Sequence, residues 1–295
     1  MIDDVIEGKR KDLGGFEVAR ILPHARRRTV GPFVFLDHMG PAEFAPGMGL
    51  DVRPHPHIGL STLTYLFDGE FVHRDSLGCT QPVRPGEVNW MTAGSGIVHS
   101  ERTGPDVRAA GGAMHGLQAW IALPEEDAEI DPAFDHYEAA DLPTFEDGGV
   151  WGRLIAGAAQ GERSPVKVRS PMFYLHWEMQ AGARAAAPEG YPERAVYVAA
   201  GAVEVNGQAF GPGRLVVLAA GDRPVVTALE PSTVACLGGE SVGQPIVWWN
   251  LVSHSRDRIE QAKADWAAGR MTLPPDDDAE FIPLPDAPKP PERMS

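Results

Sequence analysis

The two halves of this chain repeat each other, and that duplication limits its possible folds more than any other feature. The phrases YLFDG and RPGEVNWMTAG in the first half match YVAAG and GPGRLVVLAAG in the second half. The matched positions are Tyr65 with Tyr197, Gly69 with Gly201, Gly86 with Gly213, and Gly94 with Gly221. Glycine at fixed places in a repeat indicates turns that need positive φ or a close backbone approach. The sequence therefore predicts two tandem domains built on one strand-turn-strand plan.

The segments around those glycines have the length and composition of β-strands. Short runs such as FEVARIL and FVFL within residues 16–36, and then LSTLTYLF, GIVHSE and LQAWIAL, alternate or cluster apolar residues between Gly, Pro or Asp. The 33 glycines and 27 prolines among 295 residues favour many short strands over helices. We therefore expect an all-β fold of two tandem antiparallel barrels.

A change in composition marks the expected boundary between the two domains. After Pro124 the sequence becomes acidic, from EEDAEIDPAF to ADLPTFEDGG, and we interpret this stretch as the connection. The N-terminal barrel is therefore predicted to take residues 1–144, and the C-terminal barrel residues 145–295.

One helix is predicted near the end of the chain, at about residues 255–268. Ser255 is its candidate N-cap and Gly269 its stop signal. The apolar residues at helical spacing are Ile259, Ala262 and Trp266. The last 22 residues are rich in Pro and Asp and are predicted to form an extended tail, in which FIPLP docks on a barrel surface.

The acidic balance of the chain argues against nucleic acid and membrane partners. The formal charge is −15, from 26 basic and 41 acidic residues, so the field of the protein repels phosphate backbones and anionic lipids. The basic run from Arg26 to Arg28 is interpreted as a solvated loop. Cys79 and Cys236 fit no disulfide or thiolate-metal pattern, and the sequence has no signal-peptide core and no apolar run of about 18 residues. We expect a cytoplasmic protein.

Two pairs of polar residues in the first half have the spacing of metal ligands on strands. His55 and His57 stand two apart, as do His99 and Glu101. Side chains two apart on a strand point to the same face, so both pairs can look into one barrel. Three neutral imidazoles and a carboxylate suit one divalent ion of iron, manganese, nickel, copper or zinc, and not the all-oxygen sites of calcium or magnesium.

The duplicated half supplies an internal control for this metal site. The same steps counted from Tyr197 and Gly221 reach Ala187 and Glu189, and then Val226 and Ala228. The second half therefore keeps the scaffold without the ligands. We predict one metal per chain, held by the first barrel, with a degenerate second barrel that is structural or binds partners.

The segments around these ligands resemble those of a known family. HPHIGLSTLTYLFDGEFVHRDSLG, PGEVNWMTAGSGIVHSE and HGLQAWIALP are similar to the signature segments of the pirin family of bicupins, and FVFLDHMGP also matches. The resemblance runs from about residue 15 to the FIPLP tail. It implies two antiparallel cupin barrels face to face, a mostly monomeric state, and quercetin 2,3-dioxygenase activity as in several members. It also implies iron as the usual metal, with His55, His57, His99 and Glu101 as its ligands.

One position departs from the family pattern. Many pirins carry a glutamate shortly after the HxH pair, where this chain has Ser61. A serine cannot replace a carboxylate as an anionic ligand or base. Metal binding is expected to survive because Glu101 is present, whereas the flavonol activity is put in question.

The resulting hypothesis is an iron(II) protein that acts on a flavonol or similar enol substrate with O2. Glu101 is a candidate proton acceptor for the substrate hydroxyl. His38, His115 and Gln118 are candidates for outer hydrogen-bond donors or pocket wall, and equally for structural hydrogen bonding. Ser61 is a further candidate for the outer shell or the pocket wall. The remaining histidines have no partner at metal spacing and receive no role: His24, His73, His136, His176 and His254.

Two other functions stay open at this point. The first is a redox-sensing, regulatory protein in which the oxidation state of the metal changes the surface offered to a protein partner, without turnover. The second is a cupin isomerase or lyase that uses the metal as a Lewis acid alone. The sequence names neither the native metal nor the substrate.

Overall fold

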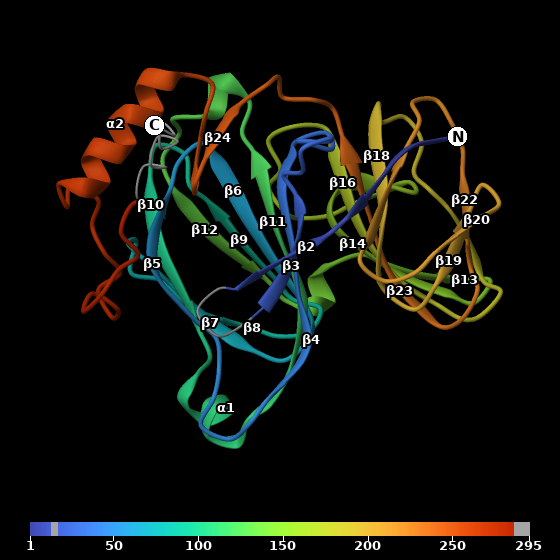
Figure 1. Ribbon diagram of the computed structural model, residues 1–295, viewed down its shortest axis with the longest axis horizontal. Helices are drawn as coiled ribbons and strands as arrows, with labels where there is room; N and C mark the ends of the chain where they lie inside the picture. The colour runs from blue at the N-terminus through green and yellow to red at the C-terminus, as the bar shows by residue number, and fades with distance from the viewer. Residues whose placement is uncertain (13–16, 286–295) are drawn as a thin grey trace, which may run out of the picture.

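The strands predicted from the sequence assemble into two β-barrels side by side, each made of a large and a small antiparallel sheet (Figure 1). The computed structural model describes residues 1–12 and 17–285. Phe16 and residues 286–295, which the sequence assigned to a strand and to the tail, lie outside the described residues. The prediction of an all-β fold with two cupin barrels is confirmed.

The first barrel combines a seven-stranded and a four-stranded sheet. The large sheet contains, in spatial order, β12 (Ala133–Tyr137), β9 (Val88–Thr92), β6 (Leu60–Asp68), β11 (Gly112–Ala122), β4 (Phe33–Phe44), β3 (Glu17–Leu22) and β2 (Lys9–Asp12). The small sheet contains β5 (Asp51–His57), β10 (Ile97–Arg102), β7 (Phe71–Asp75) and β8 (Thr80–Val83). A short helix, α1 (Pro105–Ala110), connects β10 to β11.

The second barrel repeats this arrangement. Its large sheet contains β1 (Ile2–Glu7), β21 (Arg214–Leu218), β18 (Glu193–Ala200), β23 (Ser232–Gly239), β16 (Met172–Met179), β14 (Val150–Ala159) and β13 (Thr144–Asp147), with β15 (Glu162–Arg163) also paired to β14. Its small sheet contains β17 (Arg184–Ala186), β22 (Val225–Ala228), β19 (Val203–Val205) and β20 (Gln208–Phe210). Hence β5 and β10 of the first barrel correspond to β17 and β22 of the second.

The matched glycines are the turns that the repeat predicted. Every one of them has a positive φ, between 49° and 89°: Gly69, Gly86, Gly94, Gly201, Gly213 and Gly221. At Gly94 an added Cβ would lie 2.0 Å from the carbonyl oxygen of Ile130, so close packing as well as backbone conformation requires glycine there.

Each end of the chain packs on the barrel that the other half of the chain forms. β1 pairs with β21 in the second barrel, and the N-terminus lies beside that barrel in Figure 1. Conversely, the hairpin of β24 (Ile246–Trp248) and β25 (Leu251–Ser253) contacts the first barrel, through a bridge between Ile58 and Leu251. A single division at residue 144 therefore describes the middle of the chain and not its ends.

The stretch after Pro124 is more than a connection. It contains two short 3-10 helices, η1 (Glu125–Asp127) and η2 (Ala139–Asp141), and between them β12, which pairs with β9 at the edge of the first barrel. Sequence reasoning missed β12 because all five of its residues are only partly buried or exposed, so its apolar signal is weak.

The predicted C-terminal helix is confirmed as α2 (Arg256–Ala267). The Ser255 side chain accepts a hydrogen bond from the Arg258 backbone N–H, as its role as N-cap requires. The buried residues are Ile259, Ala262 and Trp266. Ile259 and Ala262 pack against Ile58 and Leu251, so this helix covers one side of the first barrel.

The largest apolar cluster lies between the two large sheets. It joins side chains of the first barrel, such as Leu63 and Leu117, to side chains of the second, such as Leu215 and Leu237. Strands β6, β11 and β4 are therefore buried on both faces, one against the second barrel and one toward the interior of their own barrel.

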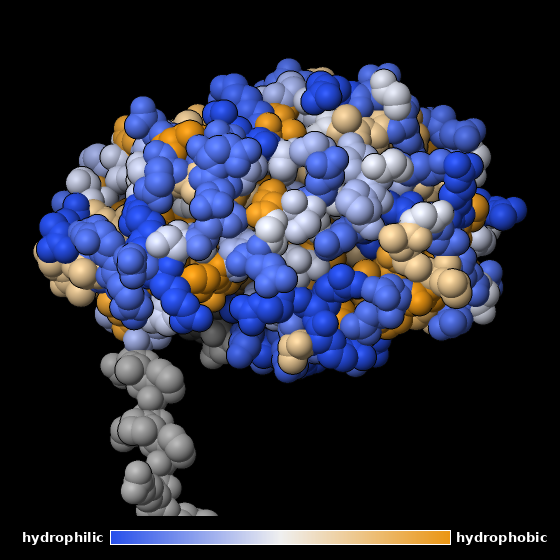
Figure 2. All heavy atoms as spheres, turned by 90° about the horizontal axis from the view of Figure 1, so that it is seen from above, coloured by the Kyte–Doolittle hydropathy of each residue, from blue (hydrophilic) through white to orange (hydrophobic). Residues whose placement is uncertain are grey.

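On the face shown in Figure 2 the surface is mostly hydrophilic, with apolar groups in small separate areas. No helix among the described residues is both long and apolar enough to cross a membrane.

Candidate metal centre

The three predicted histidine ligands come from two neighbouring strands. β5 and β10 are antiparallel, with His99 opposite His55 and His57 opposite Ile97. The register shifts between His99 and Glu101, where β5 carries Pro54 and so has no N–H to donate. Such a bulge re-aims the side chains beside it.

The three imidazoles converge inside the first barrel. One nitrogen from each ring lies within 4.8 Å of the other two, which makes His55, His57 and His99 a possible metal-binding group. The distances between ring centroids are 5.0 Å for His55 and His57, 4.4 Å for His55 and His99, and 5.0 Å for His57 and His99. All three side chains are buried.

Backbone carbonyls fix the outward nitrogens of two of these rings. Nδ1–H of His55 donates to the Arg53 carbonyl at 2.9 Å, and Nδ1–H of His57 donates to the Asn250 carbonyl at 2.9 Å. A ring that donates from Nδ1 keeps Nε2 as a lone-pair donor for a metal. Asn250 lies between β24 and β25, so the C-terminal hairpin orients a ligand of the N-terminal barrel.

A histidine and an aspartate on β7 support the third ring. His73 Nε2 lies 2.9 Å from Asp75 Oδ2, and His73 Nδ1 lies 3.3 Å from His99 Nδ1. Because the carboxylate accepts from Nε2–H, His73 Nδ1 is left to accept from Nδ1–H of His99, whose Nε2 then points inward unprotonated. No role was predicted for His73 from the sequence. Its spacing of two from Asp75, on a strand neighbouring β10, was the available signal.

Burial keeps the three inner imidazoles neutral. It lowers the pKa of His55 to about 4, and it lowers the pKa of His57 and His99 well below the ordinary value of 6.5. Burial also raises the pKa of the Glu101 carboxyl to about 7, opposed by a hydrogen bond from Thr64. Neutral imidazole is the form that binds metals.

Glu101 lines the same cavity as the three histidines but is not a member of the tight histidine group. The Thr64 hydroxyl donates to the Glu101 carboxylate, and its oxygen lies 2.6 Å from the side-chain Oε1 of Gln118. Gln118, predicted as pocket wall, does line the cavity. The structure thus brings Glu101 and Gln118 together with the histidines.

The histidines open onto a cavity of about 540 Å³, hereafter the metal cavity. Phe35 and Trp120 stack in its wall with ring centroids 3.8 Å apart and an angle of 9° between their planes. Arg20 lies over the Phe35 ring at 4.4 Å and makes two hydrogen bonds, of 2.8 and 2.7 Å, with Asp37. This volume and mixture of aromatic and polar groups suit a small organic ligand.

The other candidate outer residues lie elsewhere. His38 Nδ1 is 2.8 Å from the Tyr197 hydroxyl of the second barrel, and His115 Nε2 is 2.8 Å from His38 Nε2. On β4 the residues that line the metal cavity are Phe35, Asp37 and Met39, so His38 points to the opposite face, toward the second barrel.

Ser61 is also absent from the cavity wall among the described residues. Its hydroxyl lies 3.2 Å from the Thr92 hydroxyl, on the same face of β6 as Leu63 and Tyr65 of the interface cluster. A side chain at this position points away from the histidines. The expected effect of the missing glutamate on substrate chemistry therefore has no geometric support.

Two family models match the chain. The model described as Pirin covers residues 15–121, and the model described as Pirin C-terminal cupin domain covers residues 174–272. A pirin-like protein of Caulobacter vibrioides is 60% identical over 289 residues, which are 97% of this chain and 100% of that protein. This chain belongs to the pirin family.

Solved structures with the same fold include pirin-family relatives. A quercetin 2,3-dioxygenase from Acinetobacter baumannii superimposes with a TM-score of 0.90 at 33% identity, covering 97% of this chain and 96% of that one. A bacterial pirin from Escherichia coli, solved in complex with nickel(II), superimposes with a TM-score of 0.64 at 21% identity, covering 82% of this chain and 100% of that one. The second likeness concerns the fold alone.

The donor atoms of this pirin-family chain fit a divalent transition metal. Nε2 of His57 and Nε2 of His99 are buried and have no hydrogen-bond partner among the described residues. Leaving buried polar nitrogens without a partner is costly, and a metal ion would satisfy both.

A second group of possible ligands occurs among the described residues, at the edge of the first barrel: Glu87, His136 and Glu138. His136 Nε2 lies 3.9 Å from Glu87 and 3.6 Å from Glu138, and Glu138 is exposed. Glu87 is buried and already accepts a hydrogen bond from the Arg84 backbone N–H at 2.8 Å, so this group has the contacts of a structural hydrogen-bond cluster.

Proposed function

We propose that this pirin-family chain is a mononuclear non-haem metal protein of the quercetin 2,3-dioxygenase type, acting with O2 on a flavonol or a similar planar enol. The observation that carries the proposal is the convergence of three neutral, buried imidazoles at a cavity with aromatic walls. The similarity to a quercetin 2,3-dioxygenase across almost the whole chain supports the same reading.

His55, His57, His99 and Glu101 would hold one divalent ion, with iron(II) favoured by the family and manganese, nickel, copper and zinc compatible with the same donors. The bound ion would supply Lewis acidity toward a substrate oxygen and an electron path to O2. Because the three rings are neutral and the outer nitrogens of His55 and His57 are held by carbonyls, the chain presents these donors in a fixed orientation.

The protein's own residues would position the substrate and remove its proton. The stacked rings of Phe35 and Trp120 offer a flat apolar wall for a planar ligand. Glu101 lines the same cavity and would accept the proton of an enol hydroxyl when its carboxylate is not bound to the ion. The hydrogen bond from Thr64 orients that carboxylate.

Oxygen uptake tests this proposal. Protein loaded anaerobically with iron(II) is mixed with quercetin in air-saturated buffer, and consumption of O2 is followed together with loss of the flavonol absorbance. The expected result is uptake that needs both iron and quercetin and that falls at least tenfold in Glu101→Gln at equal metal content. Zinc-loaded protein is the control and is expected to be inactive.

Two outcomes would replace this proposal. Absence of uptake, together with capture of a protein partner that depends on the oxidation state of the iron, would favour the redox-sensing function. Turnover of a small sugar or keto acid by the zinc-loaded protein would favour an isomerase or lyase.

A further inference from the structure

The segment that follows α2 runs back across the first barrel and ends at the metal cavity. We call residues 276–285 the strap. It continues from the helix toward β5 and β10, the strands that carry the three histidines (Figure 1). The sequence predicted a tail that docks on a barrel surface, but not that it reaches the metal cavity.

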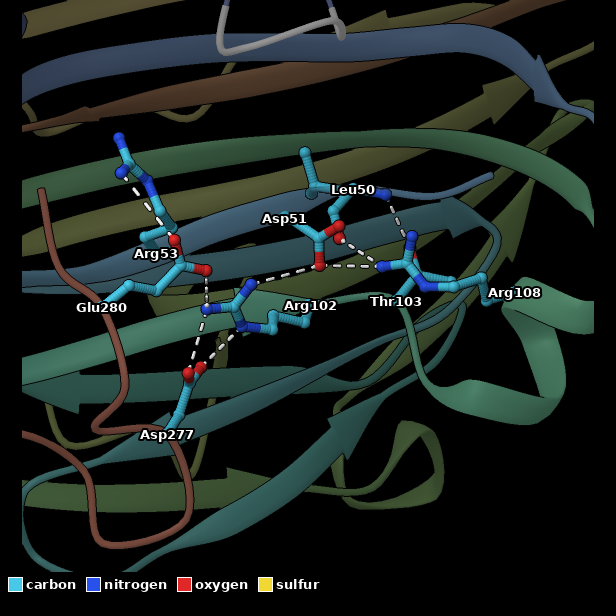
Figure 3. A network of polar contacts seen from close by, with 8 residues as sticks. All are labelled: Leu50, Asp51, Arg53, Arg102, Thr103, Arg108, Asp277 and Glu280. Atoms are coloured by element: carbon cyan, nitrogen blue, oxygen red, sulfur yellow. Dashed lines mark hydrogen bonds and ion pairs between the residues drawn. The ribbon is translucent and has the colours of Figure 1, made fainter. Parts of the chain in front are cut away.

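Arg102 fastens the start of the strap. Its guanidinium makes two hydrogen bonds with Asp277, at 2.6 and 2.9 Å, and a third with Glu280 at 3.0 Å (Figure 3). Arg102 directly follows Glu101 on β10, so its side chain points to the outer face of the strand whose inner face carries the metal ligands.

Two further contacts fasten the end of the strap. The Ile282 backbone N–H donates to the Pro54 carbonyl at 2.8 Å, beside His55. The Trp266 indole N–H of α2 donates to the Ile282 carbonyl at 3.0 Å, and the Phe281 ring meets the Trp266 ring edge-on at 5.4 Å. Ile282 also forms part of the wall of the metal cavity.

Apart from these contacts, the strap is held by an ion pair of Glu280 with Arg53 of β5 at 3.8 Å (Figure 3). None of residues 276–285 is fully buried, and 47% of Phe281 is exposed. The strap belongs to no sheet, whereas β5 and β10 beneath it are paired along their length. A segment fixed by a few polar contacts and partly buried side chains can open without unfolding of the barrel.

We propose that the strap is the gate of the metal cavity, with Arg102 as its latch and Ile282 as the residue that limits the size of planar ligands reaching the histidines. In the closed state Ile282 narrows the cavity. When Asp277 and Glu280 leave Arg102, the strap swings away from Pro54 and the mouth widens. The class of ligand, a small planar aromatic chelator or enol, rests on the proposed function, whereas the gating itself requires no turnover.

Metal transfer to a planar chelator tests the gate. Zinc-loaded protein is mixed with 4-(2-pyridylazo)resorcinol, and the rate of colour formation is measured. The latch variant, Asp277→Asn with Glu280→Gln, keeps the side-chain shapes and is expected to release zinc about tenfold faster, the equivalent of one charged hydrogen bond. Added salt is expected to accelerate transfer from the parent protein more than from the latch variant, because salt screens ion pairs.

A matched control distinguishes the effect of opening the latch from the effect of losing any surface ion pair. Asp265→Asn breaks the 2.7 Å ion pair of Asp265 with Arg270 near the end of α2 and is expected to leave the transfer rate unchanged. Ile282→Ala is expected to accelerate transfer to the planar chelator, with little effect on the equilibrium affinity for zinc.

Hydrogen exchange supplies a readout that does not depend on metal. In the latch variant the Ile282 amide is expected to exchange about tenfold faster, while the amides of β5 and β10 keep their protection. Unchanged exchange at Ile282 would overturn the gate even if the protein bound no metal. Equal acceleration across β5 and β10 would also overturn it, since the strap would then be a structural part of the barrel. Absence of oxygen uptake with quercetin would contradict the proposed function and not the gate.

Discussion

The two barrels share their sheets and turns and differ in what fills them. In the first, His99 lies opposite His55 on β5 and opposite Asp75 on β7. In the second, the strand register places Val226 opposite Ala185 and Val205. The turn glycines have positive φ in both halves. Turn geometry therefore sets the barrel, while a few interior positions decide whether it can hold a metal.

The register also corrects the correspondence between the halves. Counting along the sequence matched His55 to Ala187 and His57 to Glu189. The ladder instead matches them to Ala185 and Ala187, because the connection to the next strand is two residues longer in the second half: Ala185 precedes Tyr197 by twelve residues, whereas His55 precedes Tyr65 by ten. The conclusion that the second barrel lacks ligands is unchanged, since Ala185, Ala187, Val226 and Ala228 all belong to its apolar core.

Each imidazole of the metal centre in the first barrel has a protein partner at its outer nitrogen. His55 and His57 donate to carbonyls, and His99 is supported by His73 and Asp75. The positions in the second barrel that correspond to His73 and Asp75 are Val203 and Val205, both fully buried. The second barrel has lost the supporting pair together with the ligands.

The largest effect is expected from removing two of the converging imidazoles. His57→Ala with His99→Ala should reduce the metal content from about one per chain to near zero, because the two nitrogens without protein partners are lost together. Metal content is measured by elemental analysis after dialysis, with His24→Ala as the control. Unaltered metal content in the double variant would contradict the assignment of this site.

Placing a histidine in the second barrel tests whether that barrel can accommodate a buried imidazole. Val226→His should lower the free energy of unfolding by roughly 2–4 kcal/mol, because a buried imidazole there meets an alanine and a valine, where His99 meets a histidine and an aspartate. Urea unfolding measures the change. The same substitution at half-buried Val225 is the control and should cost less. Equal stability of Val226→His and the parent chain would show that the second barrel tolerates a buried imidazole that has no hydrogen-bond partner.

The pair that supports His99 is the next element to test. Asp75→Asn should weaken metal binding by about 10–100-fold, the usual effect of losing an outer hydrogen-bond partner of a ligand. Competition with a chelator measures the affinity. The control is Glu178→Gln, which alters a similar pair, His176 with Glu178 at 2.9 Å, at the interface of the barrels. Equal losses in both variants would deny a specific role to Asp75.

The smallest expected effect concerns the coupling between the barrels. Burial, with a contribution from His115, lowers the pKa of His38 to about 3 from 6.5. The unfolded chain therefore takes up the proton first, and the stability that depends on neutral His38 is lost as pH falls below 6.5. From pH 6.5 to 5.5 this amounts to about 1 kcal/mol.

His38→Gln should reduce that pH dependence. The measurement is the difference in unfolding free energy between the two pH values, compared with the parent chain. An identical pH dependence in both proteins would show that His38 is not held neutral at the interface.

The sequence by itself determined the duplication, the all-β class, the capped helix and the four candidate ligands, which are the first and third residues of HPH and of HSE. These follow from local rules: glycine spacing reports turns, and residues two apart on a strand share a face. The apolar residues at helical spacing in α2 are buried as predicted.

Only the tertiary structure decided which face is inside. β4, β6 and β11 are buried on both faces, so the alternation of polar and apolar residues does not distinguish the face toward the metal cavity from the face toward the second barrel. His38, His115 and Ser61 lie on the face toward the second barrel. The partners of the site come from far along the chain, as with Asn250 for His57 and Ile282 for the cavity wall. Contacts between residues so distant in sequence arise from tertiary packing, and a local sequence pattern does not predict them.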